Sequence, residues 1–119
     1  MVIAIVVAVV AVVAAVIAST AGAGAPRYAV EVLVRDKSES GKVFEGSVTK
    51  QAKGKTNILG DLLNVRVPDT VDFRNKSNKK QSAKSWRSSL TNGDYVTVNG
   101  GYKSSDRTIE AQKVVNRSR

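Results

Sequence analysis

Apolar residues fill the start of the chain and alternate with polar residues in the rest. Residues 1–18 are all Met, Val, Ile or Ala, and a helix of that length measures roughly 27 Å, close to the thickness of a bilayer's hydrocarbon core. Residues 21–26 (AGAGAP) contain glycine and proline, which end helices. We therefore predict a hydrophobic transmembrane or filament-core helix over residues 1–20, a hinge over 21–26, and a separate domain over 27–119.

Within residues 27–119, apolar side chains recur at every second position, as in half-buried β-strands. We predict a short helix within residues 79–90, between the third and fourth strands, because Trp86 and Leu90 lie four residues apart and share one side of a helix. Gly46 stands where a bulge or sharp bend is expected. Five segments fit strands: 28–35, 42–50, 62–67 (with 70–73 as a short continuation), 95–102 and 108–115.

The element order and one local run of sequence resemble the second half of an OB-fold barrel. That run goes from Trp86 and Leu90 through residues 93–100 (GDYVTVNG) to residues 109–114 (IEAQKV). The resemblance covers most of residues 28–115. It implies a mainly β fold, in which the N-terminal hydrophobic α-helix is followed by a small five-stranded OB-like antiparallel barrel, and it places Gly100 at the barrel bend, where a missing Cβ relieves crowding. A generic β-sandwich is the alternative.

The composition excludes most small-enzyme chemistry. The 119 residues include no Cys and no His, so a thiol nucleophile, a Cys/His zinc site, a His general base and a histidine-ligated haem are ruled out. The carboxylates of Glu39, Glu45 and Glu110 are isolated, and no phosphate-binding glycine motif occurs. We predict no catalytic residues, no cofactor and no metal site, and we expect that the protein is not an enzyme.

Basic residues outnumber acidic ones, 19 to 10, and no acidic residue lies between Asp72 and Asp94. OB-folds bind nucleic acid on the face of strands two and three and on the first and last hairpin loops. The resemblance therefore implies that the basic residues near these strands track a phosphate backbone. The full candidate face for an anion or nucleic acid comprises Lys50, Lys53, Lys55, Arg66, Arg74, Lys76, Lys79, Lys80, Lys84 and Arg87.

Aromatic residues make up only 5% of the chain, and single-stranded nucleic acid is usually held by stacked aromatic rings. Phe44 and Trp86 lie in patterns that favour a core role. A solvated basic loop, or one that contacts anionic lipid headgroups, explains the charge as well as nucleic acid does. The candidate stacking residues are Phe44, Phe73, Trp86, Tyr95 and Tyr102.

Small residues recur along the apolar segment at a spacing of three or four residues, which places them on one side of a helix. Such a stripe lets helices approach closely in a membrane. Ala14 lies off this stripe, and an Ala/Val helix shows some stripe by composition alone. We predict helix–helix packing through Ala4, Ala8, Ala11, Ala15, Ala18 and Gly22.

A long apolar helix with no preceding charge, a hinge and a β-rich head resemble the mature subunit of a type IV pilin-like filament. Bacterial members usually carry a glutamate at the fifth position, where this chain has Ile5, so the resemblance points to the archaeal style. It implies that the subunits associate with one another into a cell-surface filament. The subunits would lie in the membrane before assembly, and the heads would lie on the outside of the filament. A basic leader upstream of Met1 would favour this reading.

The alternative is a single-pass protein whose basic OB-like domain binds nucleic acid, or another anionic partner, at the cytoplasmic surface of the membrane. This orientation obeys the positive-inside rule, because all 19 basic residues follow the apolar segment. An initiating Met1 would favour it. Asn75 and Asn116 match the N-x-[ST] pattern and would be glycosylation sites if the domain lies outside the cell.

Overall fold

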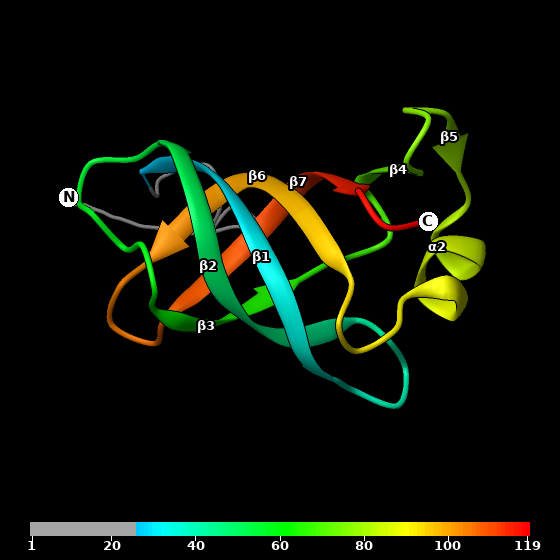
Figure 1. Cartoon of the computed structure of the whole chain (residues 1–119), viewed down its shortest axis with the longest axis horizontal. Coiled ribbons are helices and arrows are strands. Elements are labelled where there is room, and N and C mark those ends of the chain that lie inside the picture. The colour runs from blue at the N-terminus through cyan, green and yellow to red at the C-terminus, as the bar shows by residue number, and fades with distance from the viewer. Residues whose placement is uncertain (1–25) are drawn as a thin grey trace, which may run out of the picture.

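The computed structural model describes residues 26–119, which form one small β-barrel with a short helix at its end (Figure 1). The barrel order is β3-β2-β1-β6-β7, closed by pairing of β3 with β7, and β4 and β5 extend the sheet beyond β7. The elements are β1 (Arg27–Lys37), β2 (Val43–Lys53), β3 (Leu62–Arg66), β4 (Asp72–Arg74), β5 (Lys80–Gln81), α2 (Ala83–Ser89), β6 (Tyr95–Lys103) and β7 (Thr108–Asn116).

The alternation of apolar residues produces the barrel because one side of each strand faces the interior. Along β1, the side chains of Val30, Val32 and Val34 are buried, while the residues between them are partly exposed. β6 repeats this pattern with Val96 and Val98. The five predicted barrel strands are confirmed, and they form a small closed barrel consistent with an OB-like fold.

Gly100 lies where β6 bends past β7. The register of this pair shifts between Asn99 and Gly100, and a Cβ built on Gly100 would stand 2.1 Å from the carbonyl oxygen of Glu110. A backbone oxygen has no rotamer by which to move away, so only glycine fits. The expected role of Gly100 at the bend is confirmed.

The predicted fold class requires correction. A closed barrel of five strands cannot be antiparallel throughout, because directions that alternate around an odd number of strands must match once. Here β3 and β7 are parallel, and the added strand β4 also runs parallel to β7.

The helical content differs from the predicted fold class as well. The only helix among residues 26–119 is α2, which is seven residues long, and this part of the chain holds no apolar helix of the length that crosses a membrane. The predicted helix over residues 1–20, with its stripe of small residues, lies outside the described residues.

α2 closes one end of the barrel. Its predicted apolar side is confirmed, since Trp86 and Leu90 are both buried, and the Trp86 ring packs against Phe73 with ring centroids 5.3 Å apart. The helix begins at Ser82, whose hydroxyl accepts a hydrogen bond from the backbone N–H of Ser85. Figure 1 shows α2, β4 and β5 at one end of the molecule and the loop that joins β2 to β3 at the other.

Candidate functional site

The outer face of β2 and β3, where OB-folds bind ligands, carries charges of both signs. Arg66 pairs with Glu110 on β7, with 3.4 Å between their charged atoms. Glu45 is on the same face, since it lies opposite Asn64 in the β2–β3 register. These carboxylates would repel a phosphate backbone. The face therefore does not form the continuous basic track that the resemblance to OB-folds implies.

The lysines predicted to share this face with Arg66 lie elsewhere. Arg66 is opposite Val43, at the start of β2, whereas Lys53 ends that strand. Lys50 is opposite Glu31 on β1, and Lys55 is in the loop that follows β2. The structure therefore separates Arg66 from the cluster of Lys53 and Lys55.

Two predicted anion-binding arginines serve the fold itself. The Arg87 side chain is only 10% exposed and pairs with Asp69 at 2.7 Å. It also donates to the Val67 carbonyl and lies 5.5 Å from the centre of the Phe73 ring. Its hydrogen bond and its charge hold the pKa of Asp69 below the usual value.

Arg74 is used in a similar way, because its guanidinium pairs with Asp72 at 3.1 Å and donates to the carbonyl of Asn78. Both arginines thus hold the loops on either side of β4. Every ion pair among the described residues uses arginine.

What remains of the predicted basic cluster is a group of exposed lysines, which we call the lysine end: Lys76, Lys79, Lys80 and Lys84. They lie on the turn between β4 and β5, on β5 and in the first turn of α2. The turn is ordered by Asn75, whose side-chain oxygen accepts from the backbone N–H groups of Ser77 and Lys79. Four positive charges therefore stand on a fixed support with no carboxylate in that stretch of sequence.

The aromatic side chains do not form a stacking surface. Phe44, Phe73, Trp86 and Tyr102 are buried in the core, as predicted for Phe44 and Trp86. Tyr95, on β6, is the one aromatic side chain of the described residues with a large exposed fraction, 43%. Single-stranded nucleic acid would have to be held at this domain mainly by charge.

The two predicted glycosylation sites differ in access. Asn116 is only 1% exposed, and its amide nitrogen, the atom that a glycan would modify, donates to Asp94 at 3.0 Å. Folded protein therefore does not present Asn116. Asn75 is partly exposed at the β4–β5 turn, where a glycan would lie beside the lysine end.

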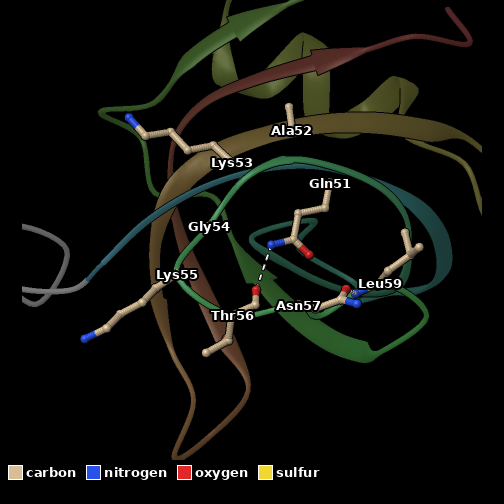
Figure 2. Close-up of a pocket in the computed structure, with 8 residues that line it drawn as sticks. All are labelled: Gln51, Ala52, Lys53, Gly54, Lys55, Thr56, Asn57 and Leu59. Atoms are coloured by element: carbon tan, nitrogen blue, oxygen red, sulfur yellow. Dashed lines mark hydrogen bonds between the residues drawn. The ribbon is translucent and has the colours of Figure 1, made fainter.

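Sequence reasoning missed the loop of residues 54–61, which had no clear pattern. Gln51 holds it from both sides: its amide nitrogen donates to the Thr56 carbonyl and its oxygen accepts from the Ile58 N–H. The Tyr28 hydroxyl accepts from the Thr56 N–H. Figure 2 shows the loop curling around a hollow with Gln51 pointing inward. Gly54 and Gly60, whose φ angles are positive, were the available signal.

The described residues present no metal-binding cluster, since residues 26–119 contain no group of three or more metal-ligating carboxylate side chains. In comparisons with known proteins, no family model, no curated protein and no solved structure matches this chain.

Proposed function

We propose that this chain is a non-catalytic module, tethered to a membrane by its apolar N-terminal segment, whose lysine end binds an anionic partner. The single observation behind this proposal is the lysine end itself. Its four side chains are exposed, whereas the neighbouring Arg74 and Arg87 are each paired with a carboxylate. Charge without a partner on an ordered support favours binding of a polyanion.

The position of the lysine end suits a tethered protein. The apolar segment joins β1 near Tyr102, whose N–H donates to the carbonyl of Pro26. Figure 1 shows β5 and α2 at the opposite end of the barrel from the first residues of β1. A tether at one end leaves the lysine end free to meet a partner in solution.

Loss of the four lysines should weaken polyanion binding. We expect a variant with Gln at positions 76, 79, 80 and 84 to bind a single-stranded oligonucleotide far less tightly. The slope of log affinity against log salt should fall by up to about 3, because each lost phosphate contact on a single strand removes about 0.7. The measurement is a fluorescence anisotropy titration of the full chain in phosphatidylcholine nanodiscs over a salt series.

A matched control removes the same number of positive charges elsewhere, through Arg35→Gln, Lys42→Gln, Lys50→Gln and Arg117→Gln, all exposed and outside the lysine end. This control should retain most of the affinity. Equal affinities and salt slopes for the wild type and the four-lysine variant would refute binding by the lysine end.

A second candidate function is a structural subunit of an extracellular, pilus-like filament that polymerises through the apolar segment with the barrel outside. The observation that favours it is the recurrence of small residues at positions 4, 8, 11, 15, 18 and 22. Close packing between copies along such a stripe relies on dispersion contacts that a larger side chain would block. In both functions the apolar segment lies in a membrane at some stage. The filament subunit ends at the cell surface, whereas the tethered module stays at the cytoplasmic face of the membrane.

A leucine on the stripe should prevent assembly if the filament exists. We expect Ala8→Leu or Ala11→Leu to abolish filaments in material sheared from the cell surface, as seen by negative-stain electron microscopy, while the barrel stays folded. Ala14→Leu makes the same change off the stripe and should leave assembly intact. Normal filaments from the stripe variants, or no filaments from the wild type, would sink this candidate.

A further inference from the structure

The loop between β2 and β3 borders a shallow hollow of about 380 Å³ that is open to solvent. Lys53 and Lys55 extend outward on one side of it and Leu59 lies on the other (Figure 2). Leu59 is 55% exposed, the largest exposed fraction among the bulky apolar side chains of the described residues. The hollow thus combines two cationic side chains with one exposed apolar side chain.

The loop that borders the hollow is held in place by contacts with β1. The Tyr28 hydroxyl lies 2.7 Å from the Thr56 hydroxyl, and the Tyr28 ring packs edge-on against Tyr102 with centroids 5.0 Å apart. Gly54 lies so close to this tyrosine that a Cβ would stand 2.3 Å from its ring. The loop is therefore fixed to the start of β1.

The same end of the barrel receives the apolar segment. Tyr28 and Tyr102 both lie there, and the carbonyl of Pro26 accepts from the Tyr102 N–H. Three basic residues are exposed at this end, Arg27, Lys103 and Arg107, and so are two acidic ones, Asp61 and Asp106. With Lys53 and Lys55, positive charge exceeds negative charge around the point where the chain leaves for the membrane.

We propose that this hollow docks onto the bilayer by binding the anionic headgroup of a phospholipid, with Lys53 and Lys55 at the phosphate and Leu59 at the boundary of the acyl chains. The inference rests on the proposed membrane tether. Basic side chains beside an exposed apolar one are typical of protein surfaces that sit at a membrane interface. A free inorganic anion would use the lysines but would leave Leu59 in water.

Docking of the hollow on the bilayer would give the barrel a fixed orientation. A tether alone lets the barrel tumble, whereas a second contact at the β2–β3 loop would fix its long axis and direct the lysine end away from the bilayer. Anionic lipid would thereby control how the partner-binding surface is displayed.

The test uses the isotope-labelled full chain in nanodiscs that contain a nitroxide-headgroup lipid, with NMR line broadening as the readout. We expect the amides of residues 54–60 to broaden more in discs with phosphatidylglycerol than in discs of phosphatidylcholine alone. Residues 38–41, in the turn between β1 and β2, provide the reference for tumbling. In the variant Lys53→Gln, Lys55→Gln, the ratio of docked to undocked barrels should fall about 25-fold, at roughly fivefold for each lysine.

The variant Arg35→Gln, Lys42→Gln is the matched control, because it removes the same charge from two exposed residues beside the turn between β1 and β2 and should dock as the wild type does. A chain that stays in the discs but shows equal broadening in both lipids would overturn headgroup binding and keep the tether. A chain that leaves the discs would overturn both. Loss of broadening on addition of inorganic phosphate, at constant ionic strength, would show a site for free anions and also overturn the proposal.

Discussion

Replacement of Trp86 by alanine is expected to destabilise the barrel by about 3–5 kcal/mol, as for other fully buried large aromatic residues. Its side chain has no measurable exposure and touches both Phe44 and Phe73, with centroid distances of 6.4 and 5.3 Å. The indole N–H also donates to the Arg74 carbonyl at 3.0 Å. Since small domains are stable by only about 5–15 kcal/mol, this single change removes a large share of the total.

Pulse proteolysis with trypsin over a urea series, on the full chain in nonionic detergent, measures this loss, because the 19 Lys and Arg residues give many cleavage sites once the barrel opens. Trp86→Phe keeps a ring and loses the hydrogen bond, so a smaller cost of about 1–2 kcal/mol is expected. Ser88→Ala, on the exposed side of α2, should change stability by less than about 0.5 kcal/mol. A Trp86→Ala variant as stable as Ser88→Ala would show that α2 is not anchored in the core.

Local pattern was enough to predict the five barrel strands and α2, because neighbouring residues alone identify each of them. Alternation marks β1 and β6, and the four-residue spacing of Trp86 and Leu90 marks α2. Gly100 could be placed as well, because the resemblance to OB-fold barrels puts a glycine of the fourth barrel strand at the bend. The relative direction of paired strands could not be predicted in this way. The parallel pairing of β3 with β7 depends on how the barrel closes, and the sequence pattern of one strand carries no information about its partner's direction.

The candidate site was harder to predict, since the role of a charged side chain depends on partners that are distant in sequence. Arg87 and Lys84 look alike in the sequence, yet Arg87 meets Asp69 from another loop and Lys84 is exposed on the helix. The β4–β5 hairpin that carries the other lysines has one strand of only two residues, too short for any periodicity. The sequence alone therefore does not separate the exposed lysines of the lysine end from the arginines that pair within the fold.

The largest remaining effect is expected at Asp94, a buried carboxylate that joins the turn before β6 to the end of β7. It accepts hydrogen bonds from the Thr91 N–H, the Asn116 amide and the Arg119 guanidinium, at 3.0 to 3.1 Å. Asp94→Ala leaves the buried Asn116 amide without its acceptor and removes a charge-assisted contact. A loss of about 3 kcal/mol at neutral pH follows.

This loss should depend on pH in a direction that the environment of Asp94 determines. Burial raises the pKa of its carboxyl, but the hydrogen bonds from Asn116, Arg119 and Thr91 outweigh burial and lower the pKa overall. A group whose pKa is lower in the folded state stabilises that state above its unfolded value, about 4, and the contribution disappears as pH falls through the folded value. The gap in unfolding free energy between the wild type and Asp94→Ala should thus be constant near neutrality and narrow below about pH 4.

Urea unfolding of both proteins from neutral to acidic pH, followed by circular dichroism, measures that gap. Asp106→Ala is the control, because Asp106 is exposed in the loop before β7, and it should lie within about 0.5 kcal/mol of the wild type at neutral pH. Arg119→Ala should reproduce only part of the loss, since the Arg119 side chain is half exposed and water can replace it. A gap that widens in acid would mean that Asp94 is held protonated in the folded barrel, so that burial, and not the three donors, controls its charge.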